Sequence, residues 1–209
     1  MEEMMTPSPR LLLSFVVDNS ASMSEERLRE LIGGFRSFAE VTKDEKGLEW
    51  EMVVFDTLTP LVVKSFEEGE LRPVGAARFP LLARATELAA ARILARAALL
   101  RKAKQEVFRP WLFVLSDGFT VDDMATVAMS LNESEARGEL IYLPFRLSQG
   151  PLCQRLTELD RIKQMVRILP GEQARFFSFL SEMIARRTAL PADRGFKFSK
   201  SDFEGWALL

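Results

Sequence analysis

Two short polar segments hold the side chains that offer chemistry in this chain of 209 residues. The first begins with Asp18, which ends an apolar run, and continues with Ser20 and Ser22. Serines two and four residues after the carboxylate can turn both hydroxyls to one side of the loop. Carboxylate and hydroxyl oxygens are hard donors, and hard donors suit Mg²⁺ or Mn²⁺, with Ca²⁺ as a further option.

The second polar segment is Ser-Asp-Gly at residues 116–118, which ends another apolar run. Runs that are apolar throughout are typical of parallel strands buried on both faces, and the carboxyl ends of such strands meet at one edge of the sheet. We therefore expect Asp18 and Asp117 to be neighbours. Thr120 and Asp122 lie just beyond, where they are predicted to form the loop and the cap of the following helix.

Composition excludes several classes of site and partner. There is no histidine, which excludes imidazole-based catalysis and His-ligated metals, and the single cysteine, Cys153, forms no internal disulfide or thiolate cluster. A net charge of −2 gives no overall attraction for nucleic acid or anionic membranes. The N-terminus does not resemble a signal peptide, and no apolar stretch is long enough to span a bilayer. We expect a cytoplasmic protein with neither nucleic-acid nor membrane partners.

Enzyme templates fit the same residues poorly. A phosphatase that uses a strand-ending aspartate as nucleophile needs a second aspartate two residues later, and this position is Ser20. The sequence contains no phosphate-binding loop, dinucleotide fingerprint or nucleophile elbow. We therefore expect a protein that is not an enzyme. A metal-dependent phosphoryl transfer through Asp18 is the alternative from another class.

Short β-branched or aromatic runs alternate with longer helical patterns along the chain, which is typical of βαβ units. The pattern predicts strands at 11–18, 50–56, 61–66, 111–117, 140–147 and 166–169. It predicts helices at 25–40, from the end of the 67–80 loop to about 104, and at 122–137, 151–160 and 171–187. The expected fold is a doubly wound α/β layer sandwich, with helices on both faces of a mostly parallel sheet and one antiparallel edge strand.

Three further expectations concern the parts of this fold. Residues 1–10 are predicted to form an N-terminal extension, 11–187 the domain, and 188–209 an aromatic tail without a helical or strand period that could dock on the body. The pair Gly33-Gly34 is expected to let the first helix pack closely. The arginines of the Ala-rich helix are expected to form a solvated face: Arg84, Arg92, Arg96 and Arg101.

At these residues the sequence resembles a known family. Asp18-x-Ser20-x-Ser22 after the first strand, with Asp117 ending the fourth, is similar to the metal-ion-dependent adhesion site of von Willebrand factor A domains. The resemblance covers about 11–187. Within that family, short cytoplasmic bacterial proteins of the tellurium-resistance (TerY-like) type are nearest in length and in the style of both segments.

The resemblance implies a role for each matching residue. Ser20 and Ser22 would coordinate a Mg²⁺ or Mn²⁺ ion directly, and Asp18 and Asp117 would bind it directly or through water. An Asp or Glu of a partner protein would complete the site, in a bacterial stress or tellurite-resistance setting.

The sequence departs from the family pattern in one loop. The family normally adds a threonine before the long helix, where this chain has Ala77 followed by Arg78. In the alternative interpretation, Arg78 pairs with Asp18 or Asp117 and replaces the ion, which leaves a metal-free scaffold.

Overall fold

The computed structural model describes residues 8–20, 23–45, 47–55, 62–64, 81–148 and 153–209. The strands are β1 (Leu11–Asp18), β2 (Leu48–Phe55), β3 (Val62–Lys64), β4 (Trp111–Ser116), β5 (Ile141–Arg146), β6 (Val166–Ile168) and β7 (Ala207–Leu208). The helices are α1 (Glu25–Thr42), α2 (Leu82–Lys102), α3 (Met124–Ala136), α4 (Gln154–Ile162), α5 (Gln173–Thr188) and the 3₁₀ turn η1 (Lys200–Phe203). No helix within these ranges is both long and apolar enough to cross a membrane.

The strands form one sheet in the order β3-β2-β1-β4-β5-β6-β7. All neighbouring pairs are parallel except β2 with β3 and β6 with β7, at the two edges. The predicted fold class is confirmed, and so is the antiparallel edge strand, β3. Strand β7 adds a second antiparallel edge that the sequence does not predict, because two residues are too few to show a period.

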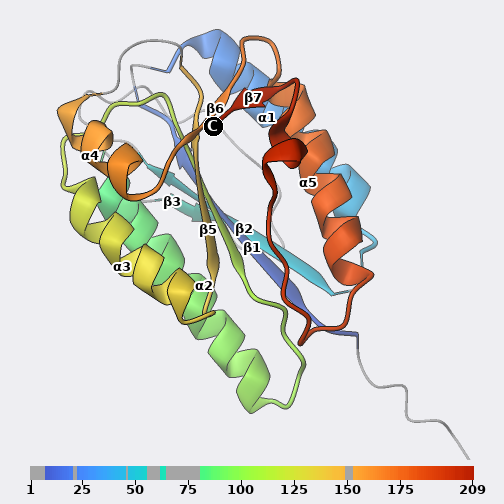
Figure 1. Ribbon diagram of the computed structural model, residues 1–209. Coiled ribbons are helices and arrows are strands. Elements are labelled where there is room, and N and C mark those ends of the chain that lie inside the picture. The colour runs from blue at the N-terminus through green and yellow to red at the C-terminus, as the bar shows by residue number, and fades with distance from the viewer. Residues whose placement is uncertain (1–7, 21–22, 46, 56–61, 65–80, 149–152) are drawn as a thin grey trace, which may run out of the picture.

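Helices cover both faces of the sheet (Figure 1). Residues that alternate along each strand point to opposite faces, so Phe15 packs in the core beneath α1 and α5, whereas Val16 packs in the core beneath α2, α3 and α4. Ser24 caps the N-terminus of α1, because its hydroxyl accepts a hydrogen bond from the backbone N–H of Arg27 at 3.3 Å.

The aromatic tail is part of the main core. Phe196, Phe203 and Trp206 are all more than 90% buried there, together with side chains of β4, β5 and α5. In Figure 1 the tail runs beside α5 and returns to the sheet edge as β7. The expectation that this segment docks on the body is therefore confirmed.

The arginines of α2 lie on a solvated face as expected, and the side chains of Arg92 and Arg96, 43% and 42% exposed, also form ion pairs with β2. The guanidinium of Arg92 donates from Nε to Glu51 Oε2 at 2.9 Å, and Arg96 pairs with Glu49 at 2.8 Å. Glu51 is fully buried in β2, where burial raises the pKa of its carboxyl while the bond from Arg92 lowers it. These pairs join α2 to β2.

Gly34 allows close contact between α1 and α5. A Cβ atom placed on Gly34 would lie 1.9 Å from Cε2 of Phe177, whereas one placed on Gly33 would meet nothing within 4 Å. The two glycines are adjacent in one helix, so they share the same backbone conformation and differ in what surrounds them. The expected close packing is confirmed for Gly34 alone.

This difference gives a matched pair of substitutions. We expect Gly34→Ala to lower the free energy of unfolding by about 1–3 kcal/mol, because the Phe177 ring must move within a packed core. Gly33→Ala should instead stabilise the protein by up to about 1 kcal/mol, because alanine favours the helix. Chemical denaturation of both variants measures the two effects, and equal effects would contradict the proposed contact.

Candidate functional site

Asp18 and Asp117 lie together at the carboxyl ends of β1 and β4, as predicted. These strands are neighbours, paired in parallel up to Val17 opposite Leu115. The hydroxyl of Ser116 donates a hydrogen bond to Asp18 Oδ2 at 3.0 Å, which links the two strand ends. Since β2 follows β1 on one side and β4 lies on its other side, the acids stand at the point where the strand order reverses. Ligands of doubly wound sheets commonly bind there.

Each aspartate holds the turn that follows it. Asp18 Oδ1 accepts a hydrogen bond from the backbone N–H of Ser20 at 2.9 Å, and Asp117 Oδ1 accepts one from Phe119 at 3.1 Å. Gly118 has a φ of +106°, a conformation that side chains disfavour, so glycine suits this turn. The two loops therefore present their carboxylates in the same local way.

The two carboxylates repel each other. Burial is the main cause that raises the pKa of Asp18 to about 7 from an ordinary value of 3.8, and the negative charge of Asp117 raises it further. Hydrogen bonds from Ser20 and Ser116 oppose this rise. The pair therefore favours a positive charge between its members, which a proton or a cation can supply.

The donor set fits a hard divalent cation. Asp18 and Ser20 are at most 1% exposed and Asp117 is 7% exposed. Asp117 Oδ2 accepts no hydrogen bond from the residues that the structure describes. The described residues contain no cluster of three or more His, Cys, Asp or Glu, so a cation here would need hydroxyl ligands as well.

Three residues of the predicted site lie outside the described residues: Ser22, Ala77 and Arg78. Their predicted roles as a metal ligand and as substitutes for the missing loop ligand remain predictions. The structure brings together Asp18, Ser20 and Asp117 from two loops.

Asp122 caps a different helix from the one predicted. Its carboxylate accepts hydrogen bonds from the backbone N–H groups of Ala83 and Arg84, both at 3.0 Å, in the first turn of α2. Asp123 is the residue that caps α3. The expected role in the following helix is therefore wrong for Asp122, because the loop after β4 crosses the N-terminus of α2 and satisfies donors there.

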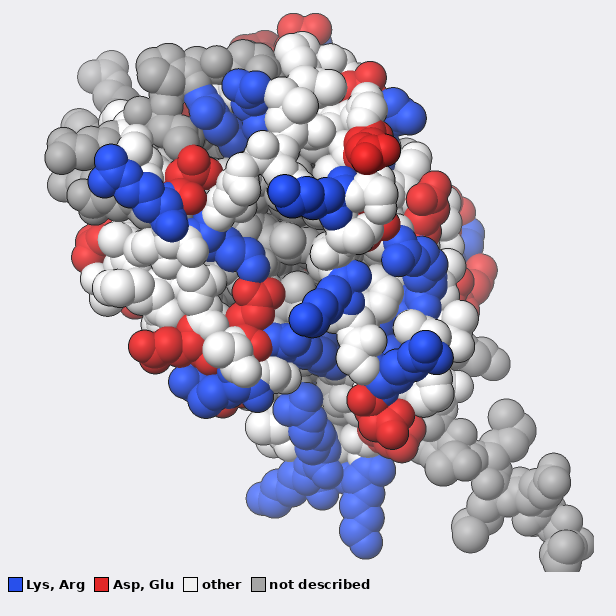
Figure 2. Space-filling model, in the orientation of Figure 1, with Lys and Arg blue, Asp and Glu red and all other residues white. Residues whose placement is uncertain are grey.

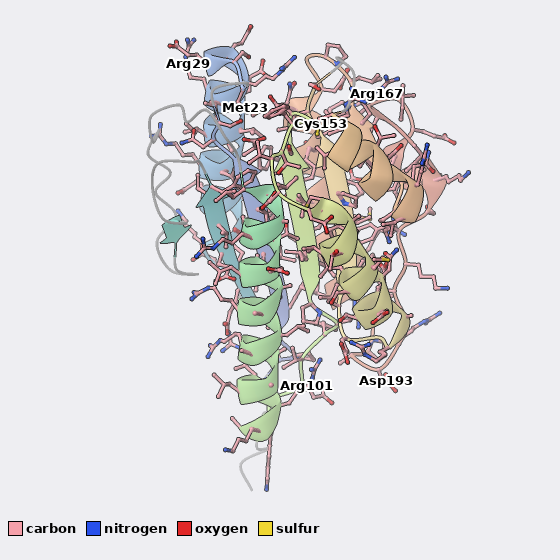
Figure 3. The ribbon with its side chains drawn as sticks, turned by 90° about the vertical axis from the view of Figure 1, so that its left-hand side faces the viewer. Met23, Arg29, Arg101, Cys153, Arg167 and Asp193 are labelled. Atoms are coloured by element: carbon pink, nitrogen blue, oxygen red, sulfur yellow. The ribbon has the colours of Figure 1, made fainter. Side chains whose placement is uncertain are left out.

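Arg146 is a charged neighbour of the site that sequence reasoning missed. It ends β5 opposite Ser116, and the charge of Asp117 acts on its guanidinium. Figure 3 shows Arg167 near the same upper end of the molecule as Met23 and Cys153, opposite Arg101 and Asp193. The register of the strands reveals these arginines, since the sequence by itself does not show which residues end opposite Ser116.

No family model matches the chain, and neither does any curated protein sequence. Among solved structures, the manganese-loaded TRAP protein of Plasmodium vivax aligns with 14% identity and a TM-score of 0.49, over 73% of this chain and 62% of that chain. An aerotolerance-related membrane protein from Bacteroides fragilis, with multiple mutations to serine, aligns with 14% identity and a TM-score of 0.51, over 85% and 99%. The N-terminal domain of TFIIH p34 aligns with 11% identity and a TM-score of 0.50, over 84% and 98%. The likeness to the last two structures shows that the chain shares its α/β fold with other solved proteins.

Proposed function

We propose that this protein is a non-catalytic interaction module that binds an acidic group of a partner protein through a divalent cation. Mg²⁺ or Mn²⁺ would be held by Asp18, Ser20, Ser22 and Asp117. The proposed setting is a bacterial stress or tellurite-resistance system in the cytoplasm, which rests on the sequence resemblance and on the single cysteine.

The observation that carries this proposal is the meeting of Asp18 and Asp117 at one sheet edge. The buried Asp18 carboxylate supplies charge, and Ser116 and the Ser20 backbone hold its orientation by hydrogen bonds. Asp117 supplies an oxygen that accepts no bond from the described residues. When bound, the cation would keep part of its charge, because neutral hydroxyls complete its ligand set, and it would therefore attract a carboxylate from outside.

Calorimetric titration tests the proposal directly. We expect wild-type protein to bind Mn²⁺ and Mg²⁺ in the millimolar range or more tightly, with about one ion per chain. The Asp18→Asn variant should lose at least about tenfold in affinity, because a charged ligand is replaced by a neutral one.

Asp123→Asn is a matched control for this titration. Asp123 is an exposed acid near the site, and asparagine is also a good N-cap, so α3 should be preserved. Its ion affinity should equal that of the wild type. Absence of binding to the wild type, or equal losses in both variants, would refute the proposal.

A further inference from the structure

Four polar side chains form one row across the end of the sheet. Ser116 is in register with Arg146, and Arg146 with Arg167. Asp18 continues the row on β1, because its carboxylate accepts the Ser116 hydroxyl. Residues in register on neighbouring strands project from the same face of a sheet. The row therefore has a carboxylate at one end and two guanidinium groups at the other.

The two arginines have few internal partners. Arg146 donates one hydrogen bond of 3.5 Å to Ser148, and neither arginine has an ion pair within 4.0 Å among the described residues. Burial and then the charge of Arg167 lower the pKa of Arg146, which shows that the two cations oppose each other. Two adjacent guanidinium groups are stabilised by an external anion, which they can bind through parallel N–H donors.

Two acids lie close to this pair without forming an ion pair with it among the described residues. Asp160 of α4 and Asp117 both act on Arg146, but Asp160 Oδ1 already accepts the backbone N–H of Met165 at 2.7 Å. In Figure 2, many basic side chains, with acidic ones among them, lie over the side of the molecule that carries β5 and β6. This face is therefore suited to an acidic segment, although the whole chain has a net charge of −2.

We propose that Arg146 and Arg167 form a second acidic-group subsite, so that the partner segment carries two carboxylates instead of one. This inference rests on the proposed function, in which the first carboxylate meets the cation at Asp18 and Asp117. The second carboxylate binds the guanidinium pair.

The spacing of the strands limits the partner sequence. Neighbouring strands lie about 4.8 Å apart, so Arg146 stands about 10 Å and Arg167 about 14 Å from Asp18 along the row. Alternate side chains of an extended segment are about 7 Å apart on one side, and a flexible arginine side chain can span the remaining distance. The partner motif is therefore two acidic residues separated by one residue.

Two synthetic glycine–serine peptides test this inference. One carries a single glutamate, and the other carries Glu-x-Glu, and both are titrated into ¹⁵N-labelled full-length protein with saturating Mg²⁺ while chemical shifts are followed. The wild type should bind the Glu-x-Glu peptide about fivefold more tightly than the single-glutamate peptide. The double variant Arg146→Gln with Arg167→Gln should bind both peptides equally, at the wild-type affinity for the single-glutamate peptide.

Two further variants exclude indirect effects. Arg101→Gln removes an exposed charge at the opposite end of the molecule and should keep the full preference (Figure 3). Replacing both Arg146 and Arg167 by lysine keeps the positive charges but removes the paired N–H donors of the guanidinium groups. Part of the preference for the Glu-x-Glu peptide should therefore remain, which keeps the test informative even if the glutamine variant folds poorly.

The outcomes separate the two proposals. If the wild type binds the single-glutamate peptide better in Mg²⁺ than in EDTA but gains nothing from the second glutamate, the second subsite is refuted and the proposed function stands. A preference that survives in the glutamine variant also refutes the second subsite. If Mg²⁺ does not improve binding of the single-glutamate peptide, the proposed function itself is refuted, and this inference with it.

Discussion

An Asp18→Asn variant should be more stable than the wild type above pH 7 when divalent cations are removed with EDTA. The pKa of Asp18 is raised to about 7 in the folded protein, whereas an exposed aspartate of the unfolded chain has a value near 3.8. Between about pH 4 and pH 7 the folded state therefore holds more protons than the unfolded state, so wild-type stability falls as the pH rises through this window. Asparagine does not ionise, so the stability of Asp18→Asn should not fall in this way.

The expected gain from Asp18→Asn grows from near zero at pH 4 to on the order of 4 kcal/mol above pH 7. Urea unfolding at several pH values in EDTA measures it. Asp44→Asn serves as the control, because Asp44 is exposed and its side chain forms no hydrogen bond or ion pair with the residues that the structure describes. A variant that is less stable than the wild type at every pH would show that the buried carboxylate is not strained by its charge.

Divalent cations should reverse the order of stability if the proposed function is correct. Saturating Mn²⁺ stabilises a folded protein that binds it, by an amount that grows with the logarithm of the ion concentration. The wild type should gain this stabilisation and Asp18→Asn should gain little. The same substitution is therefore expected to stabilise the protein without metal and to remove its response to metal.

The second large effect is expected for Trp206→Ala, which should lower the free energy of unfolding by about 3–5 kcal/mol. Trp206 is 5% exposed, and its indole N–H donates to the Asp202 carbonyl at 3.0 Å. Its ring stacks on Phe145 of β5, with 6.3 Å between the centroids, and lies 5.1 Å from the ring of Phe179 on α5. Its removal would leave a cavity between the tail, the sheet and α5.

Leu208→Ala is a matched control for Trp206→Ala, because it lies two residues away in β7 and its side chain is 43% exposed. It should change stability by less than about 0.5 kcal/mol. Thermal or urea unfolding compares the two variants. Similar small effects in both would show that the tail is not part of the main core.

The sequence predicts the central part of the fold well because its signals are strong there. Strands such as β1 are apolar at nearly every position, which is typical of strands buried on both faces. An aspartate comes at the carboxyl end of each of two such strands. The meeting of Asp18 with Asp117 could therefore be inferred from chain order and sheet geometry.

The remaining features depend on contacts between distant segments. Strand β7 forms only because Trp206 and its neighbours dock on the core, and a strand of two residues has no period of its own. Asp122 follows the usual pattern of a local helix cap, but its carboxylate lies at α2 instead. Arg146 becomes part of the site only through its register with Ser116. Local patterns do not contain these pairings.

Crystals grown or soaked with Mn²⁺ show whether the site holds an ion, because anomalous scattering locates the ion without reference to function. We expect one strong anomalous peak between Asp18, Ser20 and Asp117 in the wild type, and its loss in Asp18→Asn. A wild-type crystal at millimolar Mn²⁺ with no peak at these residues, or with a peak only elsewhere, would contradict this expectation.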